Sequence, residues 1–327
     1  MVQRARALWG PLWWLPALPW VAYAALVGAL DRVKWEHVVM AAFVAVLAYG
    51  GERCRKFYLE SLPFFVLFLV YDALRYVMPI SVTPSRVLGC SLDSAERALF
   101  GVQMGGAVHT PNEVLGRLAN PALDLICAVP YGAYLFVMLG HFAYLTRKCS
   151  EEARRFAWLA LGTHTLGFIT YQLLPAAPPW YVREHGCVID FAVGNSPAAL
   201  ARVDALLGIN YFHDLYSRGS VAFGALPSLH VTYPLYGLLV TYRSASLPSR
   251  VLQIAYAVAM PFAAVYLNHH YVLDVLLGFT YTLVVFAVVQ RVFPVGRADT
   301  EAAGSTAPEP SRDSLACPAD RASALSR

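Results

Sequence analysis

The sequence predicts an all-α membrane protein that crosses the bilayer about eight times. Of its 327 residues, 58% are hydrophobic and only 14% are charged, and the mean hydropathy is +0.50. Soluble domains carry about 25% charged residues, so this composition excludes that class. Several apolar runs approach or exceed the roughly 20 residues that a helix needs to cross the hydrocarbon layer. Basic residues recur in the short loops between these runs, as is typical of cytoplasmic loops.

Eight apolar runs are assigned as spans, and the second is the shortest. They cover about residues 8–30, 38–50, 62–80, 120–145, 156–174 and 226–242, followed by a seventh that ends near residue 268 and an eighth that ends near residue 293. The first run is long and lacks a convincing small-residue cleavage site. We therefore expect no cleavable signal peptide.

Three domains are expected from this pattern. Residues 1–61 form a transmembrane hairpin, residues 62–294 form the main transmembrane domain, and residues 295–327 form a cytoplasmic tail. The tail is rich in Ala, Ser, Pro and Asp and has no aromatic residue. Because it cannot bury enough apolar surface to fold, it is expected to be disordered.

The positive-inside rule gives the orientation. With the N-terminus in the cytoplasm, the basic loops near residues 53–56, 147–155 and 243–250 all lie inside. Removing only the short second span would place the later basic loops on the opposite side. Eight spans with both ends inside are therefore the consistent solution. The two long polar loops, residues 81–120 and 175–225, then lie on the extracytoplasmic side.

The first long outer loop, residues 81–120, is too polar to cross the membrane. It contains Thr110-Pro111-Asn112-Glu113, a capping box with proline at the first helical position. Two interpretations stay open here: short amphipathic helices that lie at the membrane surface, or an ordinary structured loop.

The six cysteines show no zinc-type spacing, and their positions follow the topology. Cys90 and Cys187 lie in the two long outer loops. The others are Cys54, Cys149 and Cys317 on the cytoplasmic side and Cys127 within a span. If the outer side is oxidising, Cys90 and Cys187 alone are expected to form a disulfide. This bond would tie residues 81–120 to the loop before the sixth span.

Two histidine motifs lie in the last hydrophobic third, FGALPSLHV (residues 223–231) and LNHHYVLDVLLG (residues 267–278). His270 and Asp274 are four residues apart, so a helix would place both on one face, with the carboxylate near one imidazole nitrogen.

Pro227 suits a first helical position. Ser228 and His230 would then lie in an opening turn whose free N–H groups favour an anion. Together these features favour phosphoryl transfer through a histidine nucleophile.

The combination of PSLH with H-Y-x-x-D resembles the second and third signature blocks of the membrane type 2 phosphatidic acid phosphatase superfamily. The doubled HHY, YDALRY (residues 71–76) and LPAAPPWY (residues 174–181) are similar to the branch that contains fungal inositol phosphorylceramide synthase and its bacterial relatives. The resemblance extends from about residue 62 to residue 278. It implies a six-helix phosphatase-like catalytic core within residues 62–294, a phosphatidylinositol donor and a ceramide-like acceptor.

The sequence departs from the phosphatase pattern at two places. Ala263-Ala264 stands where the phosphatases carry Ser-Arg, and the Lys/Arg-rich first block is absent. We therefore expect a phosphotransferase. A lipid phosphatase that uses water as the acceptor is the first alternative, and a non-enzymatic lipid-binding or scramblase-like protein is the second.

The expected catalytic residues are His270, His230 and Asp274. His270, oriented by Asp274, attacks the phosphorus of a phospholipid, and His230 protonates the departing diacylglycerol oxygen. In the second half-reaction, a lipid alcohol deprotonated by His230 takes the phospho-headgroup from His270.

The expected phosphate ligands replace the missing arginine. Arg75 is the first candidate, with Asp72 holding it in place, although two such residues three apart can also simply neutralise each other. The backbone around Ser228 and the side chain of Arg218 are further candidates.

Tyr181, at the end of LPAAPPWY, is interpreted either as an interfacial anchor or as a substrate-lining residue. His269 is expected to hydrogen-bond locally beside the site. A metal site made of His230, His269, His270 and Asp274 is the alternative, but no metal or cofactor is expected.

The expected partners are membrane lipids, namely a phospholipid donor and a lipid-alcohol acceptor. The formal net charge of +4 is too small to indicate nucleic acid, and no protein partner is predicted. We expect a multi-pass integral membrane protein with its catalytic face on the extracytoplasmic side, whether periplasmic, extracellular or lumenal.

Overall fold

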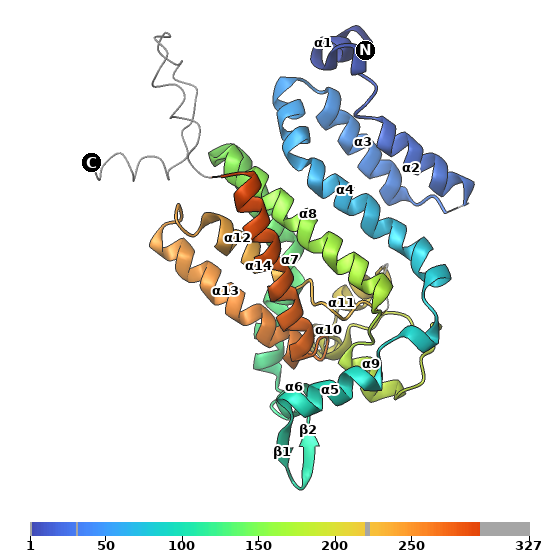
Figure 1. Cartoon of the computed structure of the whole chain (residues 1–327), viewed down its shortest axis with the longest axis vertical. Helices are drawn as coiled ribbons and strands as arrows, with labels where there is room; N and C mark the ends of the chain where they lie inside the picture. The colour runs from blue at the N-terminus through green and yellow to red at the C-terminus, as the bar shows by residue number, and fades with distance from the viewer. Residues whose placement is uncertain (1, 31, 220–222, 295–327) are drawn as a thin grey trace. The chain divides into compact units, whose positions relative to one another are not determined.

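The computed structural model describes residues 2–30, 32–219 and 223–294, so the predicted tail lies outside the described residues (Figure 1). The described chain is helical apart from a small hairpin of β1 (Val102–Met104) and β2 (Ala107–His109). The predicted all-α class is confirmed with this one exception.

The described chain divides into two compact units, with the boundary between Leu69 and Val70 inside helix α4 (Glu52–Ser81). The three-domain division predicted from the sequence stays a prediction.

The first unit contains α1 (Val2–Trp9), α2 (Leu18–Ala29), α3 (Trp35–Tyr49) and the first part of α4. The predicted span over residues 8–30 is not one helix, because Gly10 has a left-handed φ of 63° and prolines follow it. A short 3₁₀ segment, Gly10–Leu12, and turns fill the gap before α2. Aromatic packing then closes this unit, with the rings of Trp20 and Phe65 5.8 Å apart.

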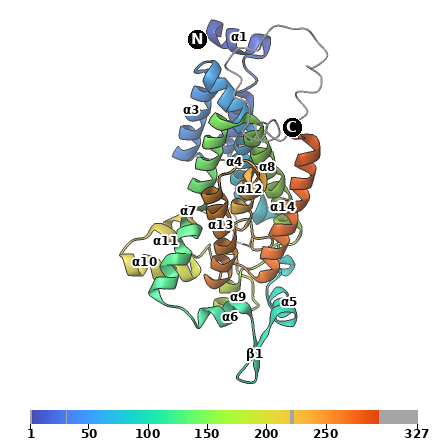
Figure 2. The same ribbon diagram turned by 90° about the vertical axis from the view of Figure 1, so that its left-hand side faces the viewer.

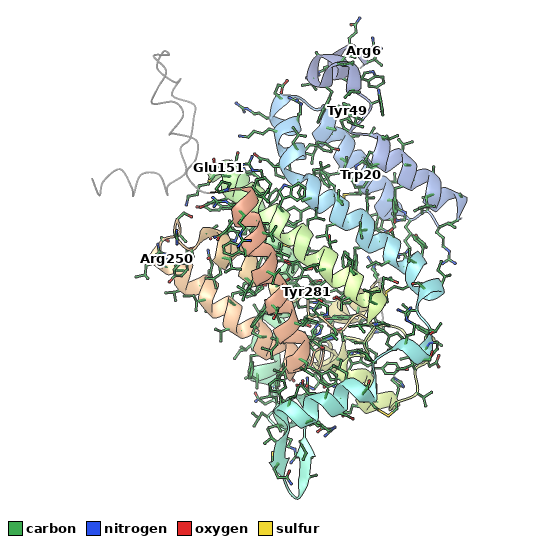
Figure 3. All side chains as sticks on the ribbon, viewed as in Figure 1. Arg6, Trp20, Tyr49, Glu151, Arg250 and Tyr281 are labelled. Carbon is green, nitrogen blue, oxygen red and sulfur yellow. A yellow bond between two sulfur atoms is a disulfide. The ribbon has the colours of Figure 1, made fainter. Side chains whose placement is uncertain are left out.

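The second unit is a helical bundle (Figures 1 and 2). Its long elements are the end of α4, α7 (Pro121–Lys148), α8 (Ser150–Leu173), α12 (Thr232–Thr241), α13 (Leu247–Tyr266) and α14 (Val272–Val292). Helix α8 packs against α7, α12 and α14, while α13 packs against α7 and α12. Side chains fill the space between these helices (Figure 3), and Tyr281 of α14 bonds to Thr170 of α8 at 2.9 Å.

Four described helices are long and apolar enough to cross a membrane, namely α4, α7, α13 and α14. The chain is therefore a multi-pass membrane protein. The predicted sixth span, residues 226–242, is helical only from Thr232 and contributes a helix of ten residues. The count of eight spans stays a prediction.

The two long outer loops contain short helices. These are α5 (Cys90–Phe100), α6 (Pro111–Gly116), α9 (Pro179–His185), α10 (Ala201–Leu207) and α11 (Tyr211–Ser217), with 3₁₀ segments at Pro84–Arg86 and Ala198–Leu200. The predicted capping box begins α6: Glu113 N donates to Thr110 Oγ1 at 3.3 Å, and Thr110 N donates to Glu113 Oε2 at 2.9 Å. Because α5 packs against α14 and α6 against α13, this segment is a docked part of the bundle. The short helices of the first interpretation are therefore present, and their position at the membrane surface stays a prediction.

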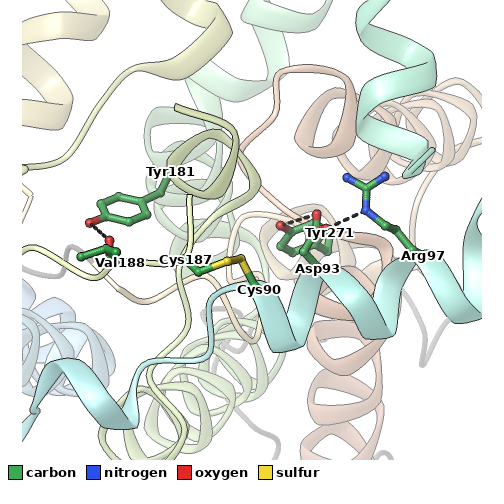
Figure 4. The surroundings of a disulfide bond; sticks show 7 residues. All are labelled: Cys90, Asp93, Arg97, Tyr181, Cys187, Val188 and Tyr271. Carbon is green, nitrogen blue, oxygen red and sulfur yellow. Dashed lines mark hydrogen bonds and ion pairs between the residues drawn. A yellow bond between two sulfur atoms is a disulfide. The ribbon is translucent and has the colours of Figure 1, made fainter. Parts of the chain in front are cut away.

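A disulfide joins the two outer loops. Cys90 and Cys187 are bonded, with their Cα atoms 5.3 Å apart (Figure 4), which confirms the predicted pair.

Candidate active site

The fold brings His230 and His270 into direct contact. His230 lies in the turn that precedes α12, and His270 lies in the turn between α13 and α14. Although 40 residues separate them, Nδ1 of His230 is 3.1 Å from Nε2 of His270. The structure therefore unites two of the three predicted catalytic residues at hydrogen-bond distance.

The surroundings of His270 determine which ring nitrogen carries a proton. Nδ1 of His270 lies 3.0 Å from the carbonyl oxygen of Ala225. A carbonyl oxygen only accepts hydrogen bonds, so Nδ1 carries the hydrogen and Nε2 of the neutral ring has a free electron pair. Nδ1–H of His230 then donates to that electron pair.

Asp274, the third predicted catalytic residue, lies beside the same nitrogen. Its Oδ2 is 3.5 Å from Nδ1 of His270 and accepts a hydrogen bond from Tyr271 N at 2.8 Å. The side chain is fully buried. In this position the carboxylate stabilises positive charge on the His270 ring through a low-dielectric environment.

The local geometry differs from the predicted helical face in one respect. His270 precedes the first residue of α14, Val272, so it shares no helix with Asp274. The chain turns sharply at Asn268, whose φ is 65°, and this turn brings the imidazole back toward the carboxylate. The prediction of proximity is confirmed, but the predicted helical i, i+4 arrangement is wrong.

The predicted helical start at Pro227 is also wrong, and phosphate binding by the backbone around Ser228 stays a prediction. Pro227 does not begin a helix, because α12 starts at Thr232. The backbone N–H of Ser228 donates to the carbonyl oxygen of Asp274 at 2.9 Å, so it is already used. This bond instead links the two histidine motifs through their backbones.

The motif LPAAPPWY holds the carbonyl group that faces His270. Ala176 N donates to Phe223 O at 2.8 Å, and Ala225 N donates to Ala176 O at 3.2 Å. On its other side, this segment bonds to Leu88, whose N–H donates to Pro175 O at 2.8 Å. LPAAPPWY is therefore the middle of three bonded segments that fix Ala225.

Tyr181 at the end of this motif is buried, with 1% of its surface exposed. Its hydroxyl accepts from Asp190 N at 2.7 Å and donates to Val188 O at 3.1 Å (Figure 4). This burial contradicts the interfacial-anchor interpretation. The hydroxyl secures the loop that carries Cys187.

Aromatic rings surround the histidines, and no local pattern in the sequence indicates them. Tyr131 of α7 stacks on His230 and on His269, with ring centroids 4.5 and 5.0 Å apart. Tyr216 of α11 also stacks on His269, with ring centroids 4.7 Å apart, and Tyr134 meets His230 edge-on at 4.9 Å. Nε2 of His269 lies 3.1 Å from the carbonyl oxygen of Pro197, a local hydrogen bond of the expected kind.

The two predicted arginine ligands are neighbours. Nε of Arg75 pairs with Oδ1 of Asp72 at 2.9 Å, and Nη2 of Arg75 lies 3.5 Å from the carbonyl oxygen of Arg218. The ion pair agrees with both interpretations of Arg75, mutual neutralisation and a cation oriented by Asp72. Its phosphate-binding role stays a prediction.

Residues from α5 and α6 contact the turn that carries His270. The carboxylate of Glu96 accepts hydrogen bonds from Val272 N at 2.8 Å and from Leu273 N at 3.1 Å. Asn112 Nδ2 donates to the carbonyl oxygen of His270 at 2.8 Å, and Tyr271 Oη donates to Asp93 at 3.1 Å (Figure 4). Sequence reasoning missed these contacts, because nothing in an acidic amphipathic segment identifies a partner more than 150 residues away.

Metal ligation was the alternative interpretation of the histidine cluster. Within residues 2–30, 32–219 and 223–294, no group of three His, Cys, Asp or Glu side chains has an arrangement that could hold a metal ion.

Comparison with known proteins places these residues in a family. Residues 104–288 match the PAP2 superfamily. The chain is 32% identical over 267 residues to phosphoinositol dihydroceramide synthase of Bacteroides thetaiotaomicron, covering 80% of this chain and 86% of that protein. No solved structure matches.

Two fungal relatives are longer than the matched region. The catalytic subunit of inositol phosphorylceramide synthase of Saccharomyces cerevisiae is 30% identical over 235 residues, 71% of this chain and 56% of that protein. Inositol phosphorylceramide synthase of Candida albicans is 28% identical over 236 residues, 71% of this chain and 48% of that protein. The match thus spans about half the length of the fungal relatives and most of the bacterial one. The chain is a membrane enzyme of the PAP2 superfamily and belongs to its inositol phosphorylceramide synthase branch.

Proposed function

We propose that the enzyme transfers phosphoinositol from phosphatidylinositol to the hydroxyl group of a ceramide-like lipid. The carrying observation is the pair of histidines, with the free electron pair of His270 Nε2 facing Nδ1–H of His230 at 3.1 Å. The names of the relatives support phosphoinositol as the group transferred and a ceramide or dihydroceramide as the acceptor.

The first half-reaction forms a phosphohistidine. Nε2 of His270 attacks the phosphorus of the donor, a P–N bond forms, and the P–O bond to diacylglycerol breaks. His230, as an imidazolium with hydrogen on both ring nitrogens, gives one proton to the departing oxygen and becomes a neutral imidazole. In the structure, Nδ1 of His230 lies next to Nε2 of His270, so the two rings must separate to admit the phosphorus between them.

The second half-reaction returns the enzyme to its starting state. His230, now a neutral imidazole, takes the proton of the acceptor hydroxyl and becomes an imidazolium again, while the oxygen attacks the phosphorus. The P–N bond breaks, and its electron pair returns to Nε2 of His270. Throughout, Nδ1–H stays on the Ala225 carbonyl, while Asp274 stabilises the positive charge of the phosphorylated ring.

The phosphate oxygens need cationic partners, and Arg75 and Arg218 are our candidates. A guanidinium gives two parallel hydrogen bonds to a phosphate, so one arginine held by Asp72 suffices for two oxygens. The distribution of basic loops supports an extracytoplasmic catalytic face.

A label-transfer experiment tests the proposal. Purified enzyme receives phosphatidylinositol labelled in its headgroup phosphate, with ceramide, with dihydroceramide or with neither. We expect label in the phosphoinositol sphingolipid only when a lipid alcohol is present. Rapid release of water-soluble inositol phosphate without an acceptor would instead identify a phosphatase. Absence of any turnover in folded protein would favour a non-enzymatic lipid-binding role.

A further inference from the structure

The first turn of α14 determines the position of the nucleophile, because it carries Asp274 and directly follows His270. The first N–H groups of a helix have no partners within the helix. A Ser, Thr, Asp or Asn side chain at the preceding position usually accepts their hydrogen bonds. Here that position is Tyr271, whose hydroxyl is engaged elsewhere with Asp93. The acceptor must therefore come from another part of the chain.

Glu96 of α5 supplies it across 176 residues of sequence. One carboxylate oxygen accepts from Val272 N at 2.8 Å and the other accepts from Leu273 N at 3.1 Å. The side chain is fully buried. An anion at this end of α14 is also favoured by the helix dipole. Asn112 completes the contact by donating to the carbonyl oxygens of Val265 and His270.

We infer that Glu96 is a positioning residue for the nucleophile, which anchors the start of α14 and so holds His270 and Asp274 in line with His230. The inference rests on the proposed function. Glu96 lies outside residues 104–288, the region that matches the superfamily.

The position of Glu96 is itself fixed by contacts outside the bundle. Helix α5 begins at Cys90, whose disulfide to Cys187 ties it to the loop after α9 (Figure 4). Arg97, the next residue, pairs with Asp93 at 2.7 Å and with Glu113 of α6 at 2.7 Å. Helices α5 and α6 therefore act together, one holding the start of α14 and the other holding the end of α13.

The charge of Glu96 adds a pH-dependent property to this contact. Burial raises the pKa of the Glu96 carboxyl, the two N–H bonds lower it, and the nearby carboxylates of Asp274 and Asp93 raise it. Arg97, the next residue in the chain, is engaged with Asp93 and Glu113. Protonation replaces one acceptor oxygen by a hydroxyl, so the contact weakens as the pH falls through the raised pKa of Glu96.

The test compares wild type with Glu96→Gln, which keeps the size of the side chain. The amide oxygen can accept a hydrogen bond from one of the two N–H groups, but the amide NH₂ faces the other N–H and cannot accept from it. We expect kcat for phosphoinositol transfer to fall about 10- to 100-fold, because small misplacements of reacting groups have effects of this size. KM should change little. In the pH–rate profile, the fall in rate at low pH that protonation of Glu96 causes should disappear.

Hydrogen exchange gives a second measurement that needs no substrate. The amides of Val272 and Leu273 should exchange faster in Glu96→Gln than in wild type. Glu184→Gln, an exposed position on α9, is the matched control. It should change neither kcat nor the exchange of the two amides. Asn112→Ala removes the other half of the contact and should act in the same direction.

Two outcomes would overturn the inference. One is a Glu96→Gln enzyme with wild-type kcat, acid limb and exchange. The other is a loss of activity in Glu96→Gln and Asn112→Ala that only matches the loss of folded, disulfide-bonded protein. If wild type shows protected amides but transfers no phosphoinositol, the proposed function fails and the anchoring contact does not.

Discussion

The two histidine-bearing turns are held in different ways. The ring of His270 and the residues next to it are bound by polar contacts with the Ala225 carbonyl, the Asp274 carboxylate, Glu96 and Asn112. The ring of His230, in contrast, lies between aromatic rings, and its one hydrogen bond to the described residues goes to His270.

This difference agrees with the positions and movements that the proposed reaction requires of each ring. A nucleophile that forms and breaks a P–N bond benefits from a fixed direction of attack. An acid–base group must move away from the nucleophile when the donor enters and then follow the proton. Ring stacking permits such movement, because it is less directional than a set of hydrogen bonds. The fold therefore fixes the proposed nucleophile and leaves the proposed acid adjustable.

The largest expected effect is that of His270→Ala, which removes the nucleophile itself. Transfer should fall by at least about 1,000-fold, since removing a nucleophile eliminates the covalent route. Incubation of wild type with labelled donor and no acceptor, followed by denaturation, should leave acid-labile label on the protein. The His270→Ala variant should carry no label. Label found on His230 in wild type would instead make His230 the nucleophile and His270 the acid–base group.

His230→Ala should reduce transfer by about 100- to 10,000-fold, the usual range for a general acid–base group. The discriminating measurement uses a donor whose leaving group needs no proton, such as a nitrophenyl phosphodiester of inositol. With this donor, formation of the phosphoenzyme should recover substantially in His230→Ala but not in His270→Ala. Equal losses with both donors would show that His230 positions the substrate and does not supply the proton.

Asp274→Asn tests the polar side of the comparison and should have a smaller effect, about 10- to 100-fold on kcat. The amide oxygen can still accept from Tyr271 N, so the turn should stay in place, and only the charge beside His270 is lost. Single-turnover measurement should show slower formation of the phosphoenzyme, with unchanged thermal stability within about 1 kcal/mol. A large loss of stability would mean that Asp274 acts mainly in folding.

The smallest effect is expected for Tyr131→Leu, which tests the aromatic side. Stacked rings contribute about 0.5–1.5 kcal/mol beyond the burial of their surface, so kcat should fall less than about tenfold. Tyr131→Phe is the matched control, since it keeps the ring that stacks on His230 and His269. A loss as large as that of Asp274→Asn would contradict the proposed difference between the two turns.

Much of the candidate site followed from the sequence, because its chemistry lies in short motifs. PSLH and HHYVLD named His230, His270 and Asp274, and the fold brings them together. The predicted helical placement of Ser228 and His270 was wrong for a local reason. The bond from Ser228 N to Asp274 O, and the turn at Asn268, replace the first helical turns that proline and spacing suggested.

Other parts of the site could not be predicted from the sequence, for different physical reasons. The partner of His270 Nδ1 is the backbone carbonyl of Ala225, and any residue type offers such a group. Tyr131 and Tyr216 are ordinary aromatic residues in an aromatic-rich chain until the packing of α7 and α11 stacks them on histidines.

Composition and short motifs were enough to predict the membrane class, the family and the candidate reactive side chains. These depend on composition and on motifs spanning a few residues, where local chemistry is enough. Only the tertiary structure decided which nitrogen of His270 is free, what holds LPAAPPWY in place and that Glu96 anchors α14. Each of these depends on a contact between segments far apart in the chain, and such contacts leave no local pattern because either partner alone is compatible with many folds.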